Sequence, residues 1–196
     1  MIIALSGKMR VGKTTLANLL DPMLPVWHAP HNFGDEVKAE CAKLLGVPRS
    51  TFYDQEMKDL DVQIPTNALR HFGLDGNGPV WTTIRKAMQL RGETARKEQP
   101  GYWVYRLHER IHDLANVLID DVRYPDEAEY VLGKPDHLLI RVHPHQYWTA
   151  GPHADHESET ALDNWTDWDV ELWPEYGQLE PQARKLSEII AKRITK

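Results

Sequence analysis

The stretch from Ser6 to Thr15 constrains this chain more than any other segment. It reads SGKMRVGKTT and fits the pattern G-x-x-x-x-G-K-[ST]. An apolar run at residues 2–5 precedes it and is long enough for a buried strand, while residues 15–20 have the character of a helix start. The pattern therefore predicts a strand, a phosphate-wrapping loop and a helix in direct succession.

The residue types of this loop explain their spacing. Gly7 and Gly12 allow a tight turn without a Cβ, so successive backbone N–H groups can point at a polyphosphate beside the positive end of the helix dipole. Lys13 can then bridge the β- and γ-phosphates, and the Thr14 hydroxyl can hold Mg²⁺. The alternative is a strand-to-helix turn that matches by chance. The expected nucleotide-binding residues are Gly7, Met9, Arg10, Val11, Gly12, Lys13, Thr14 and Thr15.

Charge and length limit the classes of protein. The 196 residues suffice for one medium α/β domain with a full core. Lys and Arg number 23 against 29 Asp and Glu, so the net charge of -6 argues against a general nucleic-acid or anionic-membrane surface. No apolar run approaches the roughly 18 residues of a membrane span. The single cysteine, Cys41, excludes an internal disulfide and is expected to be buried. We therefore expect a cytoplasmic protein.

Alternating apolar patterns predict an α/β fold with a mostly parallel, five-stranded sheet covered by helices on both faces. Strands are expected at residues 2–5, 26–29, 117–120, 138–142 and 169–173, and helices at 15–20, 34–45, 83–96, 102–114, 125–133 and 182–194. The helix at 102–114 is expected to bury Trp103, Leu107, Ile111 and Leu114. Residues 49–79 lack clear periodicity, which predicts a long irregular segment that is functional or mobile.

A second group of candidate residues, Asp120-Asp121-Val122-Arg123, lies at the end of a predicted buried strand. A carboxylate there can position Mg²⁺ through water, and Arg123 can reach the charge that develops on a transferring phosphoryl group. One of Asp120 and Asp121 can instead cap the helix that follows.

A third group recurs at helical spacing. Arg85, Gln89, Glu93 and Arg96 are four, four and three residues apart, so they can share one helix face. The two arginines can hold an acceptor phosphate bidentately. The alternative is a solvated face with salt bridges.

Residues 142–183 contain no Lys or Arg and hold four histidines among many acids. We expect a mobile lid at about 143–165. Because this lid has no basic residue, Arg10, Arg123 and Arg141 must supply the positive charge that neutralises a transferring phosphate. A zinc site at His153-x-x-His156 is an alternative, although neither cysteines nor a second tightly spaced pair accompany it.

Five motifs spread over the chain carry a family resemblance. They are the loop 7–14; Phe33-Gly34-Asp35-Glu36-Val37-Lys38, similar to F-A-D-P-x-K; Gln89-x-x-Gly92 with Arg96, like Q-x-x-G-T-E-x-x-R; residues 121–129, DVRYPDEAE, close to D-V-R-F-P-N-E-A-E; and His156-x-Ser158-Glu159, like H-x-S-E. With these motifs the chain resembles the bacteriophage-type deoxynucleoside monophosphate kinases. The block at 121–129 is the most diagnostic.

The resemblance implies a P-loop NTPase of the nucleoside monophosphate kinase type. It implies a single domain over residues 1–196, with a parallel five-stranded sheet flanked by helices, an acceptor-binding lobe at about 34–114 and a lid at about 143–165. The implied activity is transfer of the ATP γ-phosphate, with Mg²⁺, to a deoxynucleoside 5′-monophosphate. Neither a nucleic-acid polymer nor a membrane is an expected partner, monomer and homodimer both stay open, and a phage-encoded protein would act in the host cytoplasm.

The residue patterns above and the resemblance together give the expected roles of individual residues. The expected catalytic residues are Lys13, Arg10, Arg123 and Arg141. The expected substrate-binding residues are Asp35, Lys38, Arg85, Gln89, Glu93 and Arg96. The expected metal ligands are Thr14 and Asp121, the latter because it matches the family pattern.

The chain departs from this family in two places. Glu93-Thr94 stands where the family has Thr-Glu, and Pro174-Glu175-Tyr176-Gly177 replaces the family's Asn-Asp-Gly near the adenine. A runner-up is animal-type phosphomevalonate kinase, which the chain resembles through Arg91-Gly92-Glu93 with Arg96 and through Glu157-Ser158-Glu159 followed by Leu162-Asp163-Asn164. A GTP-binding switch is a third reading, although the base-reading motif N-K-x-D does not occur.

Overall fold

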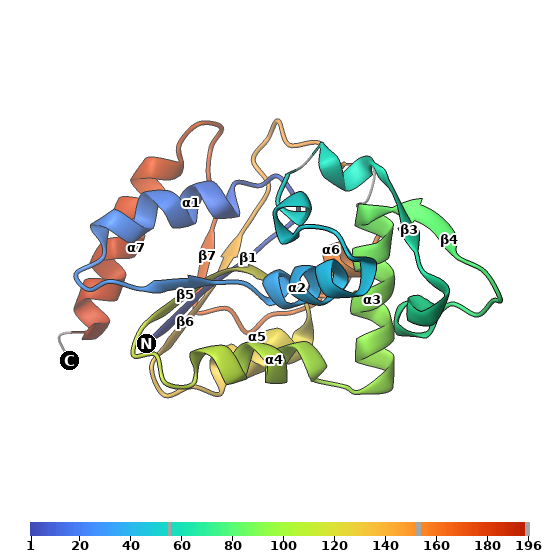
Figure 1. Cartoon of the computed structure of the whole chain (residues 1–196). Coiled ribbons are helices and arrows are strands. Elements are labelled where there is room, and N and C mark those ends of the chain that lie inside the picture. Colours follow the sequence, from blue (N-terminus) through green and yellow to red (C-terminus); the bar gives the residue numbers. More distant parts are fainter. Residues whose placement is uncertain (55, 152–153, 195–196) are drawn as a thin grey trace. The chain divides into compact units, whose positions relative to one another are not determined.

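The computed structural model describes residues 1–54, 56–151 and 154–194 (Figure 1). The chain divides into two compact units. Unit 1 comprises Met1–Asn32 and Arg110–Lys196, and unit 2 comprises Phe33–Glu109. Unit 2 has nearly the same sequence limits as the expected acceptor lobe at about 34–114. Its role in binding the acceptor stays a prediction.

Unit 1 is built on a five-stranded sheet in the order β2-β5-β1-β6-β7. Every neighbouring pair is parallel, which confirms the predicted parallel sheet. The central strands are buried almost throughout, as expected of parallel strands covered on both faces. The strands are β1 (Ile2–Ser6), β2 (Ala29–His31), β5 (Val117–Val122), β6 (His137–Val142) and β7 (Val170–Leu172).

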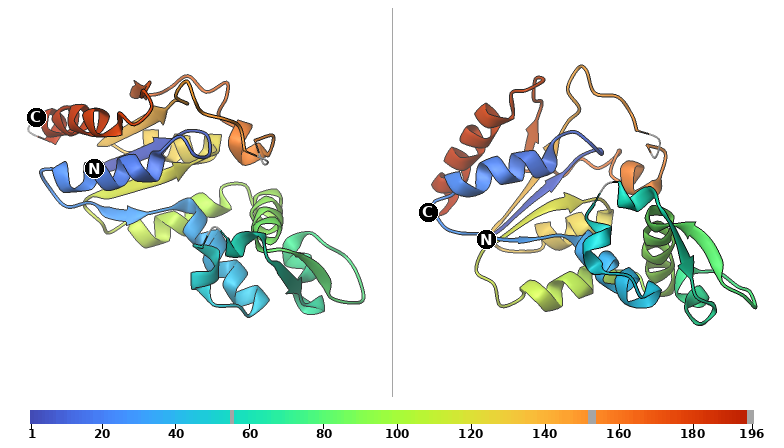
Figure 2. Two further views of the ribbon diagram at one scale, coloured as in Figure 1. Left: turned by 90° about the horizontal axis from the view of Figure 1, so that it is seen from above. Right: turned by 45° about the horizontal axis from the view of Figure 1, so that its top comes forward.

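Helices cover both faces of this sheet. The connection from β1 to β2 and the connection from β5 to β6 run across the sheet in opposite directions, so right-handed crossovers place α1 (Lys13–Leu20) and α5 (Pro125–Leu132) on opposite faces. Helix α7 (Leu179–Ile194) packs beside α1, as the views of Figure 2 show. Leu16 of α1 and Leu186 of α7 meet the sheet in one apolar core.

Unit 2 is mainly helical. Helices α2 (Phe33–Leu45) and α3 (Ile84–Glu98) pack together, and the short strands β3 (Asp61–Ile64) and β4 (Val80–Thr83) pair antiparallel. The Thr83 hydroxyl accepts a hydrogen bond from the Lys86 N–H and caps α3. Cys41 is buried in the core of this unit, as predicted.

Short helical turns complete the chain. They are η1 (Asp21–Met23), η2 (Arg49–Phe52), η3 (Met57–Asp59), η4 (Thr66–Phe72) and α6 (Glu157–Thr160), and helix α4 (Tyr102–Ile111) joins the two units in sequence. None of the described helices combines the length and the apolarity that a membrane crossing requires.

The structure corrects several predicted boundaries. Strand β2 begins at Ala29 rather than at residue 26, because pairing with β5 starts there and Trp27 is 71% exposed. Helix α4 ends at Ile111, where a turn closes from the Leu114 N–H to the Ile111 carbonyl, so Leu114 is exposed rather than buried. The segment 49–79 is not irregular throughout, since it contains β3 and three short helical turns.

Candidate functional site

The loop of residues 7–12 joins the carboxyl end of β1 to α1, as the sequence pattern predicts. Gly7 has φ 151° and Gly12 has φ 93°, both in the range that favours glycine. A Cβ on Gly7 would lie 2.5 Å from the Val142 carbonyl oxygen and 3.0 Å from the Val11 side chain. Only glycine therefore lets the loop pass this close to the end of β6.

The amino end of α1 is open to an anion. Gly12 occupies the cap position without a side-chain cap, and the first turn of the helix contains no acidic residue. Thr14 and Thr15 are exposed in this turn. The unpaired N–H groups and the helix dipole both favour negative charge here.

Lys13 is folded onto its own loop. Its side chain is 7% exposed, and Nζ donates hydrogen bonds to the carbonyl oxygens of Gly7 (2.9 Å) and Lys8 (2.8 Å). Burial, reinforced by the positive charge of Arg123, lowers the pKa of Lys13 to about 7. A phosphate group would offer this ammonium a partner of opposite charge, which the carbonyl oxygens do not.

A bulge in β5 displaces the two aspartates predicted at the end of that strand. Ala4 pairs with Ile119 and Ser6 with Val122, so two residue steps in β1 oppose three in β5. The extra residue lies at Asp120 and Asp121, and both carboxylates act on the pKa of Lys13. Such bulges re-aim side chains next to active sites. The geometry does not separate the two acids, so the preference for Asp121 as the metal ligand stays a prediction.

Of the three predicted arginines, Arg10 belongs to this loop, and Arg141 and Arg123 lie near it. Arg141 is 9% exposed and donates to the Ser6 hydroxyl at 3.1 Å. Burial lowers the pKa of Arg141 below its usual range. Arg123 is half-buried and pairs with Glu159. Arg10 differs, because its side chain is exposed and makes no hydrogen bond or ion pair within the described residues.

Sequence reasoning did not foresee the contacts between this loop and the short helix α6. Glu159 Oε2 accepts a hydrogen bond from the Met9 N–H at 2.6 Å, and its other oxygen pairs with Arg123. Lys8 Nζ donates to the Glu159 carbonyl oxygen at 2.6 Å and pairs with Asp163. Met9 and Lys8 are 150 residues or more from these partners in sequence, and Arg123 is 36 residues from Glu159, separations at which no spacing pattern operates.

His156 has a local role. Its Nδ1 accepts a hydrogen bond from the Ser158 N–H at 3.1 Å and caps α6. His153, the other member of the alternative zinc site, lies outside the described residues. Within the described residues, no cluster of three or more His, Cys, Asp or Glu side chains suits a metal ion.

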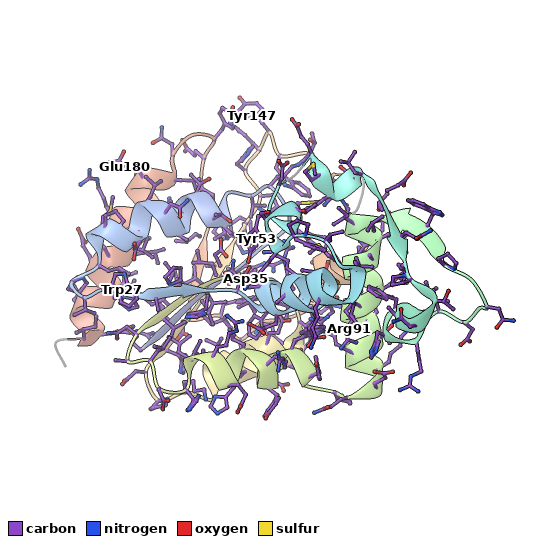
Figure 3. The ribbon with its side chains drawn as sticks, viewed as in Figure 1. Trp27, Asp35, Tyr53, Arg91, Tyr147 and Glu180 are labelled. Atoms are coloured by element: carbon purple, nitrogen blue, oxygen red, sulfur yellow. The ribbon has the colours of Figure 1, made fainter. Side chains whose placement is uncertain are left out.

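Aromatic side chains gather after β6 and β7. Tyr176 meets His145 and Tyr147 edge-to-face, with ring centroids 5.1 and 5.8 Å apart. Tyr147 (labelled in Figure 3), Tyr176 and Trp173 are all largely exposed. Trp148 Nε1, from the same segment, donates to the Met9 carbonyl at 2.8 Å. Exposed planar faces thus belong to a segment that contacts the loop of residues 7–12.

Unit 2 holds the predicted pair Asp35 and Lys38. Lys38 Nζ lies 2.9 Å from Asp35 Oδ1, and the Tyr53 hydroxyl donates to the same oxygen at 2.9 Å (Figure 3). Burial acts to raise the pKa of Asp35, but the hydrogen bonds and charge of its partners outweigh burial and hold it below the ordinary value. The ammonium of Lys38 also lies 4.2 Å from the Tyr53 ring centre.

A third cation joins this part of unit 2. Lys58 makes no hydrogen bond or ion pair within the described residues, and burial together with the charges of Lys38 and Arg85 lowers its pKa. Arg85 holds Asp59 with two nitrogens, at 2.8 and 3.3 Å. The charges of Lys38 and Arg85 thus reach Lys58, as do those of Asp59 and Asp54, which act in the opposite direction. The sequence analysis missed Lys58.

The other predicted acceptor residues are less clearly placed together. Arg96 Nη1 contacts the Gly92 carbonyl of its own helix at 3.5 Å, whereas Arg85 reaches toward η3. Gln89 and Glu93 are half-buried on α3 between them. The helical stripe therefore exists, but only Arg85 is seen to share the electrostatic environment of Lys38 and Lys58.

A buried ion pair holds the helices of unit 2. Arg91, labelled in Figure 3, donates to Glu40 Oε2 with two nitrogens, at 2.9 and 2.7 Å. The Tyr102 hydroxyl donates to the other oxygen of the same carboxylate at 2.5 Å. These contacts tie α2, α3 and α4 together, which gives Arg91 a structural role.

Comparisons with known proteins add no family assignment. The sequence matches no protein-family model, and no curated protein sequence matches it significantly.

The close approach at Gly7 gives a testable prediction. Gly7→Ala should destabilise the protein by about 3 kcal/mol, because the added methyl group meets a backbone carbonyl and the left-handed φ is strained. Gly46→Ala is the matched control, since Gly46 has φ 68° with nothing within 4 Å of its Cβ position. The control should lose only about 1 kcal/mol. Urea unfolding measures both, and equal losses would contradict the assigned close contact.

Proposed function

We propose that this chain is a P-loop phosphotransferase of the nucleoside monophosphate kinase type. It transfers the γ-phosphate of ATP, with Mg²⁺, to a deoxynucleoside 5′-monophosphate. The observation that carries the proposal is the glycine-held loop of residues 7–12 at the carboxyl end of β1, with Lys13, Arg123 and two aspartates gathered near it.

The topology of unit 1 supports a ligand at this place. In open parallel sheets, ligands bind beyond the carboxyl ends of the strands. The loop follows β1, and the two aspartates end the neighbouring strand β5. Cations, carboxylates and backbone N–H groups thus come from adjacent strands at one edge, which suits a phosphate chain with its metal ion.

Each residue would contribute to positioning and charge neutralisation, the two requirements of phosphoryl transfer. The loop N–H groups would bind the β-phosphate, and Lys13 would exchange its carbonyl partners for phosphate oxygens. Arg123 and Arg141 would stabilise the negative charge of the transferring group. No covalent enzyme intermediate is required.

The residues present fit Mg²⁺. The Thr14 hydroxyl is exposed on the first turn of α1, and the carboxylates at the β5 bulge are near enough to Lys13 to act on its pKa. Hydroxyl and carboxylate oxygens, with phosphate, are the ligands that Mg²⁺ prefers. When bound, the ion would neutralise charge on the β- and γ-phosphate oxygens.

The aromatic residues after β6 and β7 support a nucleotide as the donor. Tyr147 is exposed next to Trp148, which contacts the phosphate loop, and the exposed Tyr176 packs edge-to-face against Tyr147. A purine can stack on such faces. This would replace the base contacts that the family makes with Asn-Asp-Gly.

The cations of unit 2 support an acceptor that carries a phosphate. The charges of Lys38 and Arg85 both act on Lys58, so three cations lie within electrostatic reach of one another, and Arg85 has the planar fork that suits phosphate. This chemistry would also suit mevalonate 5-phosphate, the acceptor of the runner-up activity, since it recognises only the phosphate.

A coupled assay of ADP release tests the proposed reaction. ATP and Mg²⁺ are combined with dTMP, dGMP, dCMP, dAMP, the matching ribonucleotides and mevalonate 5-phosphate. We expect turnover with at least one deoxynucleotide and none with mevalonate 5-phosphate. Lys13→Ala should lower turnover by a factor of about 1,000 with the fold intact by circular dichroism. Turnover with mevalonate 5-phosphate alone, or an unimpaired Lys13→Ala variant, would refute the proposal.

The acceptor assignment is tested by kinetics. Arg85→Lys keeps the charge but loses the fork, and Lys58→Gln removes one cation, so each should raise the acceptor KM about tenfold or more while leaving the KM of ATP nearly unchanged. Arg184→Gln is the control, because Arg184 is an exposed residue of unit 1 paired with Glu180. Equal changes in both KM values would contradict the acceptor role and favour the alternative, in which these residues of α3 form a solvated helix face.

A further inference from the structure

Two carboxylates of one short segment pair with cations in and beside the phosphate loop. The segment, residues 157–163, includes α6 and the turn after it. Glu159 contacts the loop backbone and Arg123, while Asp163 pairs with Lys8. All of these residues belong to unit 1.

The Glu159 carboxylate is placed as a phosphate group would be. Its side chain is 7% exposed, and both of its oxygens are engaged, one by the Met9 N–H at 2.6 Å and the other by Arg123. A backbone N–H of a glycine-rich loop together with an arginine is the donor set that binds phosphate oxygens. The carboxylate therefore satisfies donors that a polyphosphate would otherwise use.

Asp163 completes the charge balance. Besides Lys8, it lies 3.7 Å from Arg141, measured between Oδ1 and Nη2. The three cations Lys8, Arg123 and Arg141 are thus matched by two carboxylates from the same segment. Desolvated cations left without partners would be costly, so this pairing stabilises the loop before any ligand binds.

We propose that residues 157–163 form an anionic plug that the polyphosphate of a nucleotide must displace. A phosphate oxygen takes the place of the Glu159 carboxylate at the Met9 N–H and at Arg123, so nucleotide binding releases the plug from the loop. Because one anion replaces another on the same hydrogen-bond donors, the affinity for the nucleotide is set by the difference between the two sets of contacts. The proposal rests on the phosphate-binding role of the loop but not on the identity of the acceptor.

Calorimetry of ligand binding to the full chain tests the plug. Sodium tripolyphosphate and MgATP are titrated into the wild type, Glu159→Gln and Glu157→Gln. Glu157→Gln is the matched control, since Glu157 is exposed on the same helical turn and its carboxylate makes no contact within the described residues. It removes the same unit of charge from the same segment.

We expect Glu159→Gln to bind both ligands about tenfold more tightly than the wild type, because a competing charge-assisted hydrogen bond is lost. Glu157→Gln should bind like the wild type. Affinity of Glu159→Gln that is equal to or weaker than that of the wild type would overturn the plug. A tightening shared by both variants would also overturn it, because that result reports general charge repulsion.

Hydrogen exchange on the unaltered chain provides a second measurement. Saturating tripolyphosphate should speed amide exchange in residues 157–163 while slowing it in the loop 7–12. Slower exchange in both segments would mean that the ligand and the plug bind together, which contradicts displacement. Tripolyphosphate binding without any kinase turnover would refute the proposed reaction but leave the plug standing, so the two failures are distinguishable.

Discussion

The approach of the Gly7 backbone to the Val142 carbonyl is the contact on which the loop depends. It holds the start of the loop against the end of β6, while Gly12 passes the chain into α1 close to Leu179 of α7. The two glycines thus hold the loop in contact with the sheet, through β6, and with helices α1 and α7. Because these two contacts involve the backbone of the loop, they do not depend on which charged partners the loop has.

Charged side chains surround this backbone, and their pairing determines which anion occupies the loop. The chain as a whole is acidic, yet Lys8, Arg123 and Arg141 concentrate positive charge beside the loop, and Glu159 and Asp163 offset it. Lys13 lies within the same field, with its pKa lowered to about 7 by burial and by Arg123. A polyphosphate would raise the pKa of Lys13, because its negative charge pairs with the ammonium. It would also compete with Glu159 for the same hydrogen-bond donors.

Local patterns in the sequence predicted the parallel sheet and most of the elements. The strand, loop and helix around Gly12 were correctly located because the motif and the apolar runs are contiguous. Strand β3 escaped prediction because four residues give too short an alternation. Glu159 and Lys58 escaped as site residues because their environment is set by tertiary contacts, which no local spacing records.

The central claim is that the backbone of residues 7–14 binds the phosphates of a nucleotide. Amide chemical shifts of the isotope-labelled chain, followed during titration with MgATP, test it most directly. The account predicts the largest shifts at the amides of this loop and the first turn of α1, with a further change at Glu159. Saturable binding that leaves these amides unmoved, with its largest shifts elsewhere in the chain, would contradict the account.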